Sequence, residues 1–273
     1  MPKIISKPPL TKLQRLGLLF KIPYDTAANI LFTWQAGKFP GSLDPSQTKE
    51  LVLSISPVMS VQDVKTVKNR FQVSYSAVLC ALYFGAIDRA LQVLGLKDIP
   101  NLASTSLVIP EGNHPGGLVI HAGMMYTSWP IKSVSPVERL QMIQDSLRIL
   151  SQSSAPYAYS VLAESLSFYP IRLRTVLTRK LLSTWKHSLD GTHLPVTSGM
   201  DMVFGLEIKD LFAGNVPWLA SGLTCTSGGL NNKFKFTFAS YKGFFGEGDV
   251  GRQLGIYAHD ELRALLLAAT KKI

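Results

Sequence analysis

The hydrophobic positions of the chain follow the helical period in some segments and the strand period in others. Residues 74–95 are apolar around most of a helical circumference, through Val78, Leu79, Leu82, Ile87, Leu91 and Leu94. A helix of this kind is typical of a buried core position. Between 233 and 241 the period is two, because Phe234, Phe236 and Phe238 alternate with more polar residues. That pattern predicts a strand with one covered face.

Other elements follow from the same two periods. Strands are predicted over 50–58, 104–109, 118–131, 194–208 and 218–225, with glycine-rich hairpin turns at 112–117 and 227–229. Helices are predicted after Ser60, from Ser135, and from about 259 to 271. The order is neither a clean βαβ alternation nor an all-β chain, so we predict a mixed α/β fold.

The clearest helix start is Ser135-Pro136-Val137-Glu138. It combines a capping serine, proline at the first helical position and glutamate three residues after the serine. Leu140, Ile143, Leu147 and Leu150 then form the predicted buried stripe.

Composition narrows the class of protein. The 273 residues are 46% hydrophobic and carry a net charge of +10, which excludes a disordered chain and a coiled coil. The positive charge is concentrated in two segments without acidic residues, 1–24 and 165–189, and the rest of the chain is neutral. The length is that of one large or two small domains.

Both basic segments have amphipathic helical patterns. In the first, Leu10, Leu13, Leu16 and Phe20 share a face that excludes Lys12 and Arg15, and we expect Pro23 to end this helix before a polar linker at 37–47. In the second, Leu173, Val176, Leu177, Leu181 and Trp185 lie opposite Arg172, Arg179 and Lys186.

This pattern favours an anionic membrane surface over nucleic acid, because the basic residues are not interleaved with aromatics on a sheet. The candidate membrane-surface residues are Lys12, Arg15, Arg172, Arg179 and Lys186. For each segment taken singly, a solvated helix face is an equally good interpretation.

The string His187-Ser188-Leu189-Asp190-Gly191 is the most enzyme-like, because a histidine held by an aspartate can act as a general base. The favoured alternative is a helix C-terminus with a cation in its last turn and glycine at the exit. The other histidines, His114, His121, His193 and His259, lack metal-ligand spacing, and Cys80 and Cys225 are predicted to be buried free thiols. We therefore assign no catalytic or metal-binding residue and leave any cofactor-binding residue unassigned.

Neither a signal peptide nor a transmembrane helix is predicted. The N-terminal apolar run lacks a small-residue cleavage site, and the two longest uncharged stretches, 112–131 and 211–232, contain Gly, Pro, Asn or His.

From about Ser42 onward, the order of motifs resembles the C-terminal portion of the wax ester synthase/diacylglycerol acyltransferase family. Thr127 to Ile131 followed by Ser135-Pro136-Val137-Glu138-Arg139-Leu140 resembles the family's "LP-[VI]…DPVERL" passage. Two further stretches resemble the family's helix start after a strand and short helix, and its late "SY-x-G" strand and turn: 51–79 and 238–243.

The resemblance implies the C-terminal half of a chloramphenicol-acetyltransferase-like, CoA-dependent acyltransferase fold. It implies two parts, a basic amphipathic segment and linker over 1–41 and a wax synthase/diacylglycerol acyltransferase C-terminal-like domain over 42–273. It further implies acyl-CoA as co-substrate, no bound cofactor, lipid substrates, and a peripheral position on the cytoplasmic side of the endoplasmic reticulum or plasma membrane. An N-terminal half could act as a partner chain.

The chain also departs from the family. The family's catalytic His-His-x-x-x-Asp-Gly lies upstream of anything in this chain, and 187–191 has a single histidine, one residue too few before Asp190, and the wrong position. Residues 197–201 stand where the family has "SNVPGP", and Tyr75-Ser76 stands in place of an Asn-Asp pair. We therefore expect no esterification of diacylglycerol or long-chain alcohol by this chain alone. The alternative is a non-catalytic protein of the same fold that binds lipid or a membrane surface.

Overall fold

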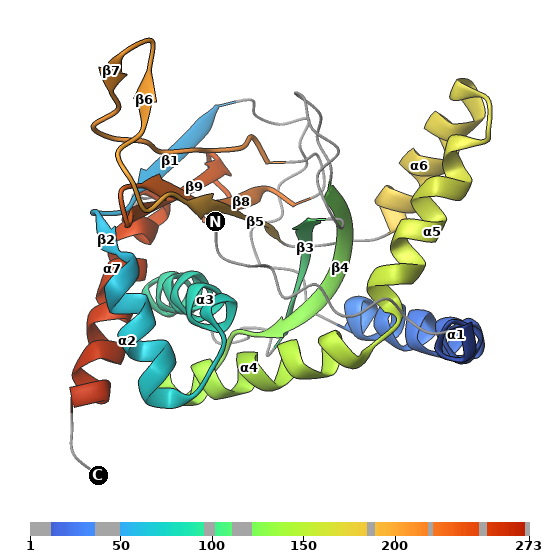
Figure 1. The fold of residues 1–273 in the computed structure, drawn as a ribbon, viewed down its shortest axis with the longest axis horizontal. Helices are drawn as coiled ribbons and strands as arrows, with labels where there is room; N and C mark the ends of the chain where they lie inside the picture. The colour runs from blue at the N-terminus through green and yellow to red at the C-terminus, as the bar shows by residue number, and fades with distance from the viewer. Residues whose placement is uncertain are drawn as a thin grey trace.

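A seven-stranded mixed sheet forms the centre of the computed structural model, which describes residues 12–35, 50–95, 102–110, 122–184, 189–217, 221–245 and 250–270 (Figure 1). The strand order is β1-β9-β8-β5-β3-β4, and β2 pairs with β9. Strand β5 runs parallel to β3 and β8, and the other pairs are antiparallel. The strands are Leu51–Ile55 (β1), Met59–Ser60 (β2), Leu102–Pro110 (β3), Ala122–Pro130 (β4), Leu189–Val196 (β5), Leu223–Leu230 (β8) and Lys233–Tyr241 (β9).

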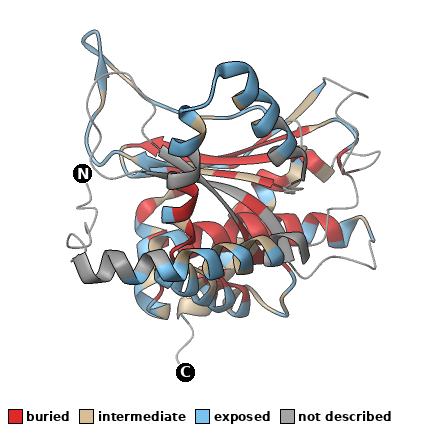
Figure 2. Cartoon of the chain, turned by 90° about the vertical axis from the view of Figure 1, so that its right-hand side faces the viewer, coloured by how far each residue is buried: buried red, intermediate tan, exposed pale blue. Residues whose placement is uncertain are grey.

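Helices cover one face of this sheet and one of its ends. Helices α2, α3, α4 and α7 form a layer on one face, and α1 and α5 contact the β3–β4 end (Figures 1 and 2). Helix α6 and the small hairpin β6–β7 project from the body (Figure 1). These elements are Lys12–Gln35 (α1), Val61–Phe71 (α2), Tyr75–Val93 (α3), Pro136–Gln152 (α4), Ala155–Ser167 (α5), Ile171–Thr184 (α6), Val250–Thr270 (α7), Met202–Val203 (β6) and Leu206–Glu207 (β7). The predicted mixed α/β class is confirmed.

Helix α3 is the centre of the core, as its apolar circumference predicts. Tyr83 and Phe84 are fully buried, and the alternating phenylalanines of β9 are buried on the face that α3 covers. Within the described residues, α3 alone is long and apolar enough to cross a membrane, but 78% of that stretch is buried inside the protein. Both cysteines, Cys80 and Cys225, are buried free thiols, which confirms that prediction.

Serine side chains start the first helices of the layer. Ser60, Ser74 and Ser135 each accept a hydrogen bond from a backbone N–H in the first turn, at 3.1–3.2 Å. At α4 the Glu138 carboxylate also accepts from the Val134 N–H at 2.6 Å. The predicted helix start at Ser135 is confirmed, with the glutamate reaching one residue further back than in an ordinary capping box.

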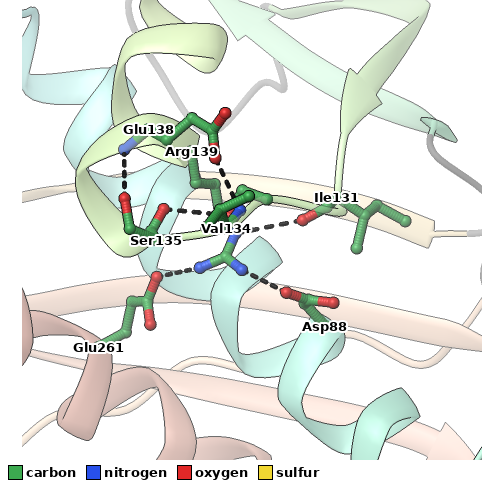
Figure 3. Close-up of polar contacts among 8 residues, drawn as sticks. Asp88, Ile131, Val134, Ser135, Glu138, Arg139 and Glu261 are labelled. Atoms are coloured by element: carbon green, nitrogen blue, oxygen red, sulfur yellow. Dashed lines mark hydrogen bonds and ion pairs between the residues drawn. The ribbon is translucent and has the colours of Figure 1, made fainter.

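A buried charge network joins three helices of this layer (Figure 3). The Arg139 guanidinium of α4 donates to Asp88 of α3, to Glu261 of α7 and, at 3.2 Å, to the Ile131 carbonyl. Burial raises the pKa of Glu261, against the opposing effect of Arg139. The absence of a side chain at Gly85 makes room for the Glu261 carboxylate, since a Cβ there would lie 2.5 Å from Oε1.

The predicted end of the first helix at Pro23 is wrong, because α1 continues through that proline to Gln35. Its second half is held by tertiary contacts. The Asp25 carboxylate accepts from the Ser154 N–H at 2.6 Å and from its hydroxyl at 2.8 Å, and Tyr159 donates to Asn29 at 2.9 Å. These contacts offset the hydrogen bond that proline removes. The predicted linker at 37–47 lies outside the described residues.

The predicted turn at 227–229 is also wrong. Those residues lie inside β8, and the turn to β9 is made by Asn231 and Asn232, which have φ of 55° and 59°. Two consecutive residues with positive φ form a type I′ hairpin turn. Gly229 is needed for close approach of the strands, because a Cβ there would lie 2.0 Å from the Lys233 carbonyl oxygen. The other predicted turn, 112–117, lies outside the described residues.

Three predicted elements, two strands and the last helix, have different bounds in the structure. The strand expected over 194–208 is β5, which ends at Val196, and the strand expected over 218–225 runs from Leu223 to Leu230. The last helix begins at Val250 rather than about 259. Gly255 lies inside this longer helix, and a Cβ on it would lie 2.6 Å from the Ser56 nitrogen, just after β1. The glycine thus permits close packing of α7 on β1.

Candidate functional site

The predicted membrane-surface residues lie on two separate helices. Lys12 and Arg15 are on α1, Arg172 and Arg179 are on α6, and Lys186 lies outside the described residues. The Arg172 side chain is exposed.

On the apolar side predicted for the second basic helix, the described residues Leu173, Val176 and Leu177 are exposed. Around the α5–α6 corner, Phe168 is 88% exposed and Ile171 68%, and further along α6 Val176 is 62% exposed. Apolar and basic residues therefore share the surface of α6, which is the helix that projects from the body in Figure 1.

The structure describes only the second part of the enzyme-like string 187–191. His187 lies outside the described residues, whereas Asp190 and Gly191 lie in β5 between β3 and β8. The alternative of a helix exit at Gly191 is therefore wrong, since the chain is already in a central strand. The Asp190 carboxylate accepts a hydrogen bond from the Ser221 hydroxyl at 2.5 Å.

The sheet presents two rows of side chains, one on each face, at the centre of β5, β8 and β9. The register pairs His193 with Ser227 and Ser227 with Phe236, and we name these three the inner row. One residue away, Thr192 pairs with Thr226 and Thr226 with Thr237, and we name these three the outer row. Because strand side chains alternate, the two rows point to opposite faces.

The inner row faces α3. His193 Nδ1 lies 2.7 Å from the Ser227 hydroxyl oxygen, and Nε2 lies 3.9 Å from the Cys80 sulfur. The imidazole ring also packs on Tyr83, with centroids 5.7 Å apart, and meets Phe236 edge-on. This cluster was not predicted from the sequence. The signal that could have indicated it is the period-two pattern of β5, which places His193 on the same face as Gly191 and Leu189.

Electrostatics keep the inner row uncharged. Burial lowers the pKa of His193 to about 4 and raises the pKa of the Cys80 thiol to about 12. At neutral pH the cysteine is a thiol and the histidine is neutral, so no activated thiolate forms. The cluster is a packed polar contact within the core.

The outer row lies under the chain segment 208–217. The Thr224 hydroxyl, two residues before the row on β8, donates to the Asn215 carbonyl of that segment at 2.7 Å. Thr226 and Thr237 are only 1% and 3% exposed, and their hydroxyls have no hydrogen-bond partner among the described residues. Buried hydroxyls without partners are rare in folded proteins.

We take the outer row, with Asp190 on the same face, as the candidate functional site. Its hydroxyls can donate to a carbonyl or phosphate oxygen, or accept from a hydroxyl. At the described positions of β5, β8 and β9 that point to this face there is no histidine, and the one acid, Asp190, accepts a hydrogen bond from Ser221. No group of three or more potential metal ligands occurs in the described parts of the chain. The face is suited to binding and orienting a substrate rather than to proton transfer.

The fold is similar to that of several solved enzyme structures. A wax ester synthase/diacylglycerol acyltransferase from Marinobacter aquaeolei VT8 matches with a TM-score of 0.58 and 15% identity, over 92% of this chain and 58% of that one. The epimerization domain from the third module of tyrocidine synthetase B matches with a TM-score of 0.61 and 10% identity, over 94% and 57%. A chain described for condensation domain-mediated chain release from the enacyloxin polyketide synthase matches with a TM-score of 0.54 and 13% identity, over 98% and 49%.

This chain has a chloramphenicol-acetyltransferase-like, condensation-type acyltransferase fold. It spans a little over half the length of the first two structures that it matches. No protein-family model and no curated protein sequence matches it. The likeness covers most of the chain, so it places nearly every described element within one architecture.

Proposed function

We propose that this chain is the C-terminal half of an acyl-CoA-dependent O-acyltransferase that esterifies a diacylglycerol or a long-chain alcohol. The fold is that of acyl-transferring enzymes, and the chain spans 58% of the wax ester synthase that it resembles. The general base would come from an N-terminal half, because the histidine of the inner row is neutral, half-buried and turned toward α3.

The observation that carries the proposal is the pair of buried hydroxyls on the outer row. Thr226 and Thr237 face each other across β8 and β9 and have no partner among the described residues. Leaving such a group unpaired costs about 1–3 kcal/mol. A substrate oxygen that accepted from or donated to both hydroxyls would remove that cost, so the outer row would orient the acyl group or its acceptor.

Binding and turnover of the purified chain test the proposal together. We expect saturable binding of palmitoyl-CoA, measured by calorimetry, and no ester from palmitoyl-CoA with hexadecanol or dioleoylglycerol, measured with a radiolabelled acyl group. Absence of binding to palmitoyl-CoA and to both acceptors would contradict the acyltransferase assignment. Steady ester formation would contradict the need for a second half.

A non-catalytic role at a membrane surface is the second candidate function, and α6 favours it. The projecting helix exposes Ile171 and Val176 together with Arg172, in a segment that has no acidic residue between 165 and 189. Apolar side chains with arginines and lysines are typical of helices that lie in a membrane interface, and each basic residue near an anionic surface contributes about 1 kcal/mol.

Flotation with vesicles tests this role. We expect the chain to float with phosphatidylserine/phosphatidylcholine vesicles at low salt, and less with pure phosphatidylcholine. Ile171→Asp on α6 should abolish flotation, whereas Arg263→Gln, an exposed arginine on α7, should reduce it little. Equal flotation on both vesicle types would refute the electrostatic contribution to membrane binding. Unchanged flotation of the Ile171→Asp variant would refute the role of α6.

A further inference from the structure

A pocket of about 380 Å³ lies where the segment after β7 meets the turn between β8 and β9. Residues 209–211 line one side, and the end of β8 and start of β9 line the other. Its volume falls in the range of about 300–1,000 Å³ that is usual for small-molecule sites. It lies near the outer row, because Lys235 is on the same face of β9 as Thr237, two residues away.

The lining of the pocket is positively charged. It carries three lysines, Lys209, Lys233 and Lys235, and a single acid, Asp210. Lys235, whose side chain is only 16% exposed, pairs with Asp210 at 2.5 Å, and Lys209 pairs with Glu207 outside the lining. Lys233 makes no ion pair with any residue that the structure describes. The lining thus has a net charge of two positive units.

The pocket also has apolar walls. Val58 and Leu211 are 49% and 45% exposed, and both contribute to the lining. A ligand that fits this lining has an anionic end and an apolar end. A phosphate monoester carries about −1.5 to −2 charges at neutral pH, which matches two net positive charges better than a carboxylate does.

We propose that the pocket binds a phosphate monoester that carries an apolar chain. Lys233 and Lys235 hold the phosphate oxygens, and Val58 and Leu211 contact the chain. The Asp210 carboxylate forms an ion pair with Lys235 in the unliganded protein, so it competes with the ligand for that ammonium group. The inference goes beyond acyl transfer and does not depend on it, because it concerns binding alone.

Calorimetry with soluble probes tests the pocket. The probes are dihexanoyl phosphatidic acid below its micellar concentration, inorganic phosphate, and dihexanoyl phosphatidylcholine, which has the same chains without a monoester. We expect saturable binding of the phosphatidic acid, weaker binding of inorganic phosphate and none of the phosphatidylcholine. Equal affinity for inorganic phosphate would assign the site to a free phosphate group and overturn the role of the apolar walls.

Three variants separate the pocket from general surface charge. Lys233→Met should weaken phosphatidic acid binding about fivefold, from the loss of one ammonium contact. Asp210→Asn should strengthen it about fivefold, because it removes the competing carboxylate. Lys65→Met, at an exposed position of α2, is the matched control and should change nothing.

Absence of phosphatidic acid binding by the native chain would overturn the proposal. Equal losses in Lys233→Met and Lys65→Met would do the same, since binding would then be general electrostatics. Weaker binding by Asp210→Asn would show that the carboxylate positions Lys235 rather than competing for it. Since all of these readouts are binding, failure of the esterification proposal would leave them unaffected.

Discussion

The inner and outer rows of the sheet are one residue apart in the sequence, but they differ in whether their polar side chains have hydrogen-bond partners. His193, Ser227 and Phe236 face α3, where the imidazole and hydroxyl are bonded to each other and the phenyl ring is buried. Thr192, Thr226 and Thr237 face the segment 208–217, where two hydroxyls are buried without a partner among the described residues. The inner row satisfies its own polar groups, so it serves the fold. The outer row does not, so it is the better candidate for binding.

The largest effect is expected on the inner row. Phe236→Ala should lower the free energy of unfolding by about 3–5 kcal/mol, since it leaves a cavity under α3. Urea denaturation measures this. Leu53→Ala, at a half-exposed position of β1, is the control and should cost less than about 1 kcal/mol. Similar losses in both variants would contradict the inner face as the core.

The charge network of the helical layer gives a second large effect. Arg139→Met leaves the Asp88 and Glu261 carboxylates buried without their cation and should cost about 3–5 kcal/mol in urea denaturation. The exposed pair Arg89–Asp260 is the matched comparison, and Arg89→Met should cost less than about 1 kcal/mol. Equal costs would indicate that the network contributes no more than a surface pair.

Protonation of His193 should destabilise the fold. Its pKa is about 4 in the folded chain against an ordinary 6.5, so below pH 6.5 the unfolded chain binds a proton that the folded chain does not. Stability should therefore fall by about 3 kcal/mol between pH 6.5 and 4 from this group. Urea denaturation at both pH values measures the loss, and His193→Gln should remove that part of the pH dependence. An unchanged dependence in the variant would contradict the burial of a neutral imidazole.

The smallest effect distinguishes the two kinds of hydroxyl on the outer face. Thr226→Val removes a buried hydroxyl without a partner and should raise the free energy of unfolding by about 1 kcal/mol, while it weakens palmitoyl-CoA binding. Thr224→Val removes a hydroxyl that donates to Asn215 and should lower the stability by about 1 kcal/mol. Losses of stability in both variants would indicate that Thr226 has a structural partner after all.

Predictions from the sequence were most accurate for elements whose structure depends on the spacing of their own residues. The buried helix α3, the alternation of β9 and the capped start of α4 each follow from local spacing, and the structure confirms all three. The errors concern helix ends that depend on contacts with residues distant in the sequence. Pro23 is tolerated because Asp25 and Asn29 bond to α5, and Gly255 lies inside α7, where it permits close packing on β1.

The candidate site could not be predicted in the same way. The string 187–191 drew attention to Asp190 by its proximity in sequence to a histidine, but within β5 successive residues such as Thr192 and His193 point to opposite faces. Thr226 and Thr237 meet only through the register of β8 with β9, which no local pattern contains. The lysines of the pocket likewise come from two segments that are 24 residues apart.

By itself, the sequence determined the mixed α/β class, the core helix, the buried thiols and the two basic segments, because these depend on local periodicity and composition. The tertiary structure alone decided which of two neighbouring residues faces the core and which faces the candidate site. The physical reason is that a strand's side chains alternate, so a change of one residue in register moves every group to the other face. Pairing between strands, made by contacts distant in sequence, sets that register.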